Sequence, residues 1–266
     1  MNFSLTLFVR RRRDLREQLL SANIATLDGV VYTHAHADHS ALSRQLAKTT
    51  KAPVIAFGDH QAGQSEIMVK WAPLLNGSGG EGVDTGFYPD ELLGDGESVD
   101  ISGVSITGLW TPGHFGNHMC FEWQDCLFTG DLVMGWASSV VSPPDGDLRA
   151  YLHSVSKLAA RTDRIYYPGH GAPIYSPQNR ARWLIDHRRA RTEQILKVLD
   201  RGPADCPTIT QHVYRDLDVS LIPAAQRNVL AHLIDLLEQN LVSIDFQGDL
   251  QTENQPKNAP AIFVKK

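Results

Sequence analysis

The chain has 266 residues, 42% of them hydrophobic, and its 25 lysines and arginines against 30 aspartates and glutamates give a formal net charge of −5. This length is enough for one large domain, or for a medium domain with a small one, and the mild acidity argues against a protein that coats nucleic acid over its whole surface. Three cysteines are too few for a disulfide framework and favour a reducing compartment.

No segment is apolar over a length that could span a bilayer. The apolar run over residues 1–9 is short, and its arginines follow it rather than precede it, which is unlike a signal peptide. We therefore expect a cytoplasmic protein with no membrane partner.

Short hydrophobic runs alternate with helical patterns and polar turns over the first two thirds of the chain. Strands are expected where such a run is bounded by turn residues, and helices where apolar residues recur every three or four positions. In chain order we predict strand 3–9, helix 15–20, strand 30–32, helix 41–48, strand 52–57, a glycine-rich loop over 75–96, strands 99–109, 119–123 and 126–129, helix 148–161 and strand 164–167.

The pattern changes near residue 176, after which helices dominate. We predict helices over 177–199, 209–217 and 223–240, then strands over 241–246 and 261–264. Three helices followed by a two-stranded hairpin are the outline of a small winged-helix module. The chain therefore divides into an expected first domain over residues 1–176 and a linker helix with a winged-helix-like domain over residues 177–266.

The chain has 11 histidines, and the segment Thr33-His34-Ala35-His36-Ala37-Asp38-His39 is its central feature. It follows the predicted strand 30–32 directly. Imidazole and carboxylate are ligands that suit zinc, iron and similar divalent ions. On an extended loop His34 and His36 can point to one side, whereas Asp38 and His39 at the start of the next helix can reach a second point. One segment can in this way hold two metal ions.

Three more candidate ligands each follow a predicted strand. They are His114 in Thr111-Pro112-Gly113-His114, Asp131 in Thr129-Gly130-Asp131, and His170 in Pro168-Gly169-His170-Gly171. Each has a glycine beside it, which lets the backbone turn sharply and present the side chain. Any one of these motifs alone is weak, but together they support one another.

These segments together resemble the signature of the metallo-β-lactamase superfamily, over residues 30 to about 174. The resemblance implies an α+β fold, a four-layer αββα sandwich with the site at one edge of its two sheets. It implies His34, His36 and His114 at a first metal ion, and Asp38, His39 and His170 at a second, with Asp131 bridging the two. Only 33 residues precede His34, so we expect the N-terminal sheet to be shortened, with an exposed edge.

Residues 111–119 and the His187-Arg188 and 193–196 segments are similar to the β-lactamase-like protein 2 group. That group carries a C-terminal winged-helix-like domain, which agrees with the pattern after residue 177. The resemblance implies metal-dependent hydrolysis, with cleavage of single-stranded RNA in some members.

The ligand set implies two divalent metal ions, with zinc as the first choice and iron or manganese as alternatives. Two such ions, about 3.5–4 Å apart, lower the pKa of a bridging water, and the resulting hydroxide attacks a carbonyl or a phosphorus. Asp38 and Asp131 are the expected catalytic residues. We expect Asp38 to ligate a metal ion and to orient the hydroxide, and Asp131 to bridge.

We therefore expect a dinuclear zinc-dependent hydrolase that acts on an ester, a thioester or a phosphodiester, with single-stranded RNA among the candidate substrates. The alternatives are a hydroxyacylglutathione hydrolase-like thioesterase, a β-lactam hydrolase, and a nucleic-acid-binding regulator with a structural zinc domain. The complete ligand set argues against the regulator, because a scaffold need not keep a bridging Asp131. The expected partner is a small ester or thioester substrate, or RNA. A second copy of the chain, forming a homodimer, is a further candidate partner.

Three further residues are candidates for contact with the metal ligands or the substrate: His118, His187 and Arg188. Arg188 belongs to the segment 180–197, in which six basic residues stand against two acidic ones. This segment could contact the phosphates of a polyanion, or it could be a solvated helix face.

Overall fold

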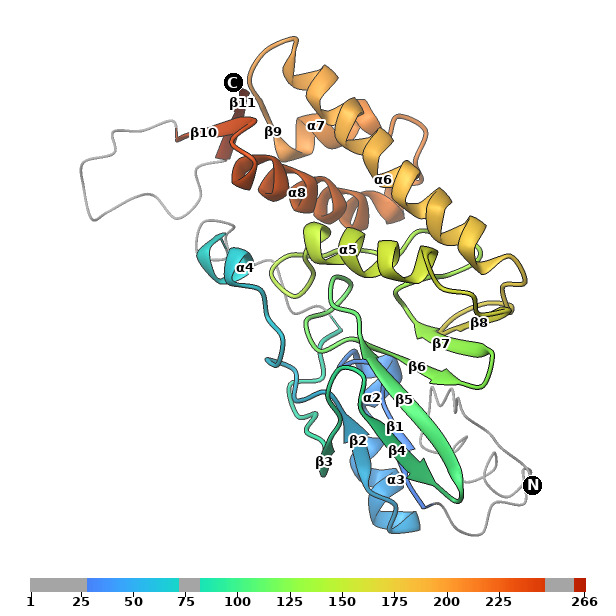
Figure 1. Ribbon diagram of the computed structural model, residues 1–266. Coiled ribbons are helices and arrows are strands. Elements are labelled where there is room, and N and C mark those ends of the chain that lie inside the picture. Colours follow the sequence, from blue (N-terminus) through green and yellow to red (C-terminus); the bar gives the residue numbers. More distant parts are fainter. Residues whose placement is uncertain (1–27, 72–81, 247–260) are drawn as a thin grey trace.

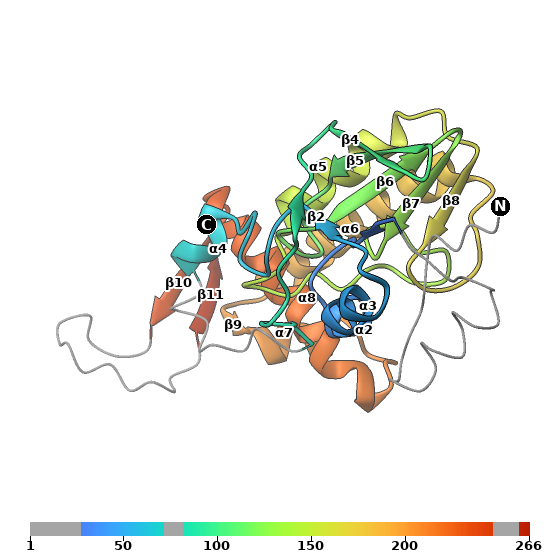
Figure 2. The ribbon, with the colours of Figure 1, turned by 90° about the horizontal axis from the view of Figure 1, so that it is seen from below.

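The computed structural model describes residues 28–71, 82–246 and 261–266 (Figure 1). The predicted strand 3–9 and helix 15–20 lie outside these residues, so both stay predictions. Two sheets lie at the centre (Figures 1 and 2). Helices α2 (Ala37–Ser40) and α3 (Ser43–Thr50) lie on one side, and helices α5 (Leu148–Ala159) and α6 (Pro177–Leu199) lie on the other. The predicted α+β sandwich with a C-terminal winged helix is confirmed.

The larger sheet has five strands in the order β4-β5-β6-β7-β8. They are β4 Ser98–Ile101, β5 Val104–Trp110, β6 Met119–Trp123, β7 Cys126–Gly130 and β8 Ile165–Pro168. All neighbours are antiparallel except β7 and β8, which are parallel. A parallel pair needs a crossover connection, and helix α5 Leu148–Ala159 supplies it. As a result β5, β7 and β8 all end at the same edge of the sheet.

The single strand predicted over 99–109 is wrong, because the structure divides it into β4 and β5. Ser102 and Gly103 form the turn between them, with φ angles of 56° and 78°. Two successive residues with positive φ are the geometry of a tight hairpin turn. Non-glycine residues rarely adopt this conformation. The turn was therefore not predicted, because a serine at position 102 is not a signal for positive φ.

The smaller sheet is parallel, with strands in the order β1-β2-β3. Its strands are β1 Val30–Val31, β2 Val54–Ala56 and β3 Glu91–Leu92. Strand β3 lies inside the segment predicted as loop, where only two residues pair with β2. Helices α2 Ala37–Ser40 and α3 Ser43–Thr50 connect β1 to β2, and α4 Glu66–Trp71 follows β2. The expected exposed edge depends on residues outside the described ranges and stays a prediction.

Apolar side chains from both sheets fill the space between them. Ile55 of β2 packs in one cluster with Ile106 of β5 and with Met119 and Phe121 of β6. These side chains are at most 3% exposed, so the short sheet is fixed to the larger one by a dry interface.

The C-terminal part begins with α6 Pro177–Leu199 and continues with β9 Ala204–Asp205, α7 Cys206–Val213, a short 3₁₀ turn Val219–Leu221, α8 Ile222–Glu238, β10 Val242–Phe246 and β11 Ala261–Lys265. Its sheet has three strands, in the order β10-β11-β9, rather than the two predicted. Helix α7 begins at Cys206 rather than at residue 209, because the Asp205 carboxylate accepts from the Thr208 amide and caps it. The division at residues 176 and 177 stays a prediction.

Helix α6 contributes to two separate cores. Ala181, Leu184 and Ile185 pack against α5 and the larger sheet. Ile195 and Leu199 instead pack with residues of α7, α8 and β11. No helix in the described part of the chain is long and apolar enough to cross a membrane.

Candidate metal centre

The ends of four strands bring the predicted ligands together. His34 and His36 follow β1, and the extended backbone at His36 precedes α2, whose first turn carries Asp38 and His39. Asp131 follows β7 and His170 follows β8 at the same edge. The loop that carries His114 connects β5 to β6 and is closed by a hydrogen bond from the Thr111 amide to the His118 carbonyl.

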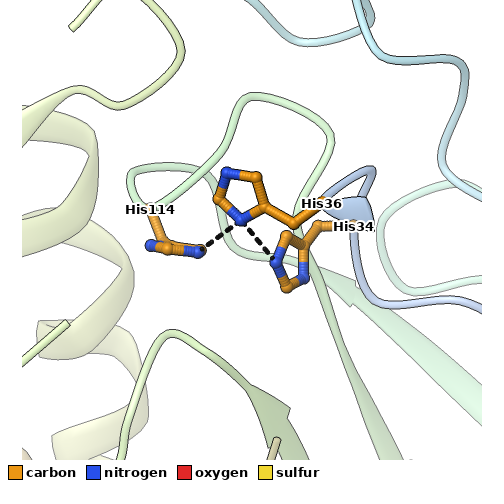
Figure 3. A group of neighbouring side chains, drawn as sticks. All are labelled: His34, His36 and His114. Carbon is orange, nitrogen blue, oxygen red and sulfur yellow. Dashed lines mark hydrogen bonds between the residues drawn. The ribbon is translucent and has the colours of Figure 1, made fainter. Parts of the chain in front are cut away.

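Three imidazoles converge on one point. The Nδ1 atom of His36 lies 2.9 Å from Nε2 of His34 and 3.0 Å from Nε2 of His114. Figure 3 shows the three rings with these nitrogens turned toward one another. Nitrogens bound to a tetrahedral zinc ion at the usual zinc–nitrogen distance are about 3.3 Å apart. The two separations from His36 are a few tenths of an ångström shorter than this, and all three nitrogens lie within 4.8 Å of one another, so the group is compact enough to hold such an ion.

The contacts around His114 decide which of its nitrogens is free to bind a cation. Nδ1 of His114 donates to the backbone carbonyl of Val140 at 2.7 Å, so Nε2 carries the lone pair that faces the site. Burial lowers the pKa of His114 below its ordinary value, lowers that of His34 well below it, and lowers that of His36 to about 3. All three rings are therefore neutral at physiological pH and can bind a cation.

A second group of candidate ligands adjoins the first. Nε2 of His170 lies 3.2 Å from Oδ2 of Asp38, and Nε2 of His39 lies 3.8 Å from the same oxygen. The Asp131 carboxylate lies between the two groups. Its Oδ2 atom is 3.5 Å from Nε2 of both His39 and His170, and 3.9 Å from Nε2 of His114.

The electrostatics at Asp131 favour a cation. Burial alone would raise the pKa of Asp131, but hydrogen bonding with His170 and His39 outweighs burial and holds the pKa far below its usual range. The same hydrogen bond to Asp131 raises the pKa of His170. Oδ1 of Asp131 is buried and has no hydrogen-bond partner among the described residues. A buried, ionised oxygen without a donor is costly unless a positive charge is bound beside it.

Two glycines make room for this carboxylate. Gly130 has a φ of +47°, and a side chain there would lie 2.7 Å from Nε2 of His118. A side chain at Gly169 would lie 2.3 Å from Oδ1 of Asp131. The glycines next to Asp131 and His170 in the sequence are thus required by close packing at the site.

The three additional candidate residues have different surroundings. His118 is fully buried, shares a 3.0 Å hydrogen bond with the Thr111 hydroxyl through Nδ1, and places its ring centre 5.2 Å from that of His34. His187 stacks on Trp183 of α6 at 4.9 Å, and burial lowers its pKa to about 4. Arg188 is 1% exposed, so it does not belong to an exposed basic face.

Two features of the site were not found from the sequence. The Val140 carbonyl fixes His114, but a backbone acceptor has no side-chain signature. Trp136 is 72% exposed, and its ring would lie 2.7 Å from a side chain at Gly171, next to His170. Its position beside the ligands depends on the fold of the loop after Asp131.

Comparisons with known proteins agree with this architecture. The sequence model of the metallo-beta-lactamase superfamily matches residues 6–170, and that of the beta-lactamase associated winged helix domain matches residues 206–247. A metallo-beta-lactamase family protein from Thermus thermophilus superposes with a TM-score of 0.74 at 24% identity, covering 98% of this chain and 88% of that one. A beta-lactamase domain protein from Burkholderia ambifaria gives 0.76 at 20% identity, covering 98% and 81%.

Among curated proteins, the chain is similar to an atrochrysone carboxyl ACP thioesterase from Aspergillus fumigatus, with 35% identity over 118 residues. That match covers 42% of this chain and 36% of the relative. A lactamase-like protein, adaB, from Aspergillus niger is 32% identical over 55% of this chain and 45% of its own length. The matches thus span less than half the length of these relatives.

Proposed function

The chain belongs to the metallo-β-lactamase superfamily of hydrolases, and we propose that it hydrolyses a thioester with the help of two divalent metal ions. The observation that carries the proposal is the position of Asp131, whose one carboxylate oxygen lies within 3.9 Å of histidines from both ligand groups. A carboxylate shared in this way fits two cations held side by side. The proposed ligands are His34, His36, His114, Asp131, Asp38, His39 and His170.

The donor set favours zinc as the native metal. Neutral imidazoles and carboxylates suit zinc, and the first group offers three nitrogens. Iron and manganese use the same donor types and stay as alternatives. The buried Oδ1 of Asp131, which has no hydrogen-bond partner among the described residues, is a further oxygen that could bind a cation.

Two bound metal ions would supply the activation of a water molecule and the polarisation of the carbonyl under attack. The chain itself orients the participants. The Asp38 side chain is 53% exposed, and its Oδ2 lies 3.2 Å from Nε2 of His170, so besides serving as a ligand it can orient incoming water. Asp131 stays ionised because of its contacts to His170 and His39.

The thioester is favoured over RNA by the contacts of helix α6. Of the six basic residues expected to form its face, Arg188 is buried and Arg180 donates to the carbonyls of Met134 and Ala137. Arg191 lies over the Tyr214 ring. The basic residues of the segment that stay exposed are Arg182, Arg189 and Lys197. This charge is small for a surface that tracks a polyanion, whereas the exposed Trp136 offers an apolar rim for an acyl group.

The experiment is metal analysis of the purified chain, combined with parallel assays of an acyl-pantetheine thioester, a single-stranded RNA and a β-lactam. We expect two metal ions per chain and turnover of the thioester well above that of the other two. Removal of the metal by a chelator should abolish the activity, and zinc should restore it. Fewer than one tightly bound metal ion, together with no turnover of any substrate, would refute the proposal. Preferential RNA cleavage would instead support the phosphodiesterase alternative.

A further inference from the structure

Two buried polar residues of the C-terminal helices contact the loop between Asp131 and α5. Arg188 of α6 donates through one terminal nitrogen to the backbone carbonyl of Ser139 and through the other, at 2.9 Å, to the side-chain oxygen of Asn228 in α8. The same oxygen of Asn228 accepts from the Val141 amide at 3.0 Å. Arg188 and Asn228 thus bind both ends of the segment 139–141.

The segment 139–141 in turn contacts two of the proposed metal ligands. The Val140 carbonyl accepts from Nδ1 of His114 at 2.7 Å. The Ser139 hydroxyl donates to the backbone carbonyl of Asp131. A continuous series of hydrogen bonds therefore leads from helices α6 and α8 to the ring of His114 and to the backbone of Asp131.

Burying the charged guanidinium of Arg188 costs free energy of folding, which indicates that its hydrogen bonds have a specific role. Arg188 is 1% exposed, and among the described residues its guanidinium donates to a neutral amide oxygen and a backbone carbonyl rather than to a carboxylate. Its Nε atom has no hydrogen-bond partner there, and the guanidinium lies over the Tyr151 ring, 5.2 Å from the ring centre. An unpaired buried charge destabilises a fold, and an apolar side chain of similar length would fill the same space at lower cost.

We infer that Arg188 and Asn228 are positioning residues for the metal centre: they fix the segment 139–141, which sets the orientation of His114 and the backbone of Asp131. The inference rests on the proposed metal centre, but it does not depend on the substrate. Groups that orient a metal ligand from behind typically change metal affinity by about 10- to 100-fold when they are lost. The C-terminal part would thus be required for metal binding although it supplies no ligand.

The test measures zinc affinity of the full chain by competition with a chromogenic chelator. We expect Arg188→Met and Asn228→Leu each to weaken the tighter zinc site by about tenfold. Asn228→Asp keeps an acceptor oxygen for Arg188 and the Val141 amide, so it should bind zinc more tightly than Asn228→Leu. Arg188→Lys keeps the charge but only one of the two donor directions, and it should fall between Arg188→Met and the unaltered chain.

The control is Arg161→Met. Arg161 is a partly buried arginine that pairs with Asp163 at 2.7 Å and Glu122 at 2.6 Å, away from the segment 139–141. The Arg161→Met substitution should lower the melting temperature and leave the zinc affinity unchanged. If Arg188→Met and Asn228→Leu lower the melting temperature but bind zinc as tightly as the unaltered chain, the inference is overturned. Should Arg188→Met not fold, the order of affinity between Asn228→Asp and Asn228→Leu decides.

The outcome is separate from that of the proposed function. An unaltered chain that binds zinc tightly but hydrolyses no thioester would refute the proposed activity, while the variants would still decide the role of Arg188. An unaltered chain that binds no zinc would overturn both.

Discussion

Oδ2 of Asp131 lies 3.5 Å from Nε2 of His170, although the two residues follow different strands, β7 and β8. The first prediction concerns Asp131→Asn, which removes the negative charge between the two groups of proposed ligands. The metal content should fall from two ions per chain toward one, and kcat should fall by more than the roughly 100-fold that marks the loss of a partner behind a ligand. Elemental analysis and steady-state kinetics measure both. Asp125→Asn is the control, because Asp125 lies in an exposed turn, where its ion pair with Arg164 contributes little.

The close approach of Gly169 to Asp131 gives a second prediction. In Gly169→Ala the new methyl group would lie 2.3 Å from Oδ1 of Asp131, so the carboxylate must move. We expect weaker metal binding, measured by chelator competition, and a smaller rise in melting temperature on addition of zinc. Gly86→Ala is the matched control, since its methyl group meets Asp84 at an ordinary 3.5 Å. Equal zinc affinity in the two variants would contradict the packing argument.

The exposed ring of Trp136 gives a third prediction, on substrate binding. If Trp136 packs against the acyl group, Trp136→Ala should raise KM by roughly tenfold, the equivalent of about 1.4 kcal/mol, with kcat nearly unchanged. Kinetics on thioesters with short and long acyl chains test it, and the effect should grow with chain length. Val219→Ala removes an exposed apolar side chain of the C-terminal part and should leave KM unchanged. A fall in kcat alone would mean that Trp136 acts on the ligands instead.

His232 gives a prediction on pH. Burial, and secondarily the charge of Arg188, lower the pKa of His232 well below its ordinary 6.5. The unfolded chain takes up a proton at His232 below about pH 6.5, whereas the folded chain does not, so this part of the stability is present above pH 6.5 and is lost as the pH falls. The loss is about 1.4 kcal/mol per pH unit for one proton.

Denaturant unfolding of the metal-free chain and of His232→Gln between pH 7 and pH 5 measures this difference. Nδ1 of His232 lies 2.9 Å from the Thr192 hydroxyl, and glutamine can keep a hydrogen bond there. The variant should therefore fold and lose stability less steeply with falling pH. Parallel curves for the two proteins would show that His232 does not titrate on unfolding.

That the proposed ligands lie together was predictable because the signals were local. His34 and His36 are two residues apart on extended backbone, so their side chains lie on the same side. The helix that begins at Ala37 then directs Asp38 and His39 toward the second group of proposed ligands. The residues after β5, β7 and β8 meet because strands that run in the same direction end at one edge. Each of these arguments needs only the order of strands and the glycines beside the ligands.

Features that depend on contacts between distant segments were not predictable. The two-residue strand β9 exists only because β11 pairs with it. In the sequence Arg188 is one of six basic residues on a predicted helix. Its burial depends on contacts with distant segments, namely Asn228 of α8, the Ser139 carbonyl and the Tyr151 ring of α5. The hairpin at Ser102 was missed for a different reason, since its conformation is rare for serine.

A single helix, α6, serves two cores, and this limits where the chain can be cut. Its first half completes the core beneath α5, and its second half completes that of the winged helix. Exchange of the C-terminal module at residue 177 would expose the first core and also take away Arg188. In recombination or protein engineering, the hydrolase domain and its winged helix should therefore be transferred together as one unit.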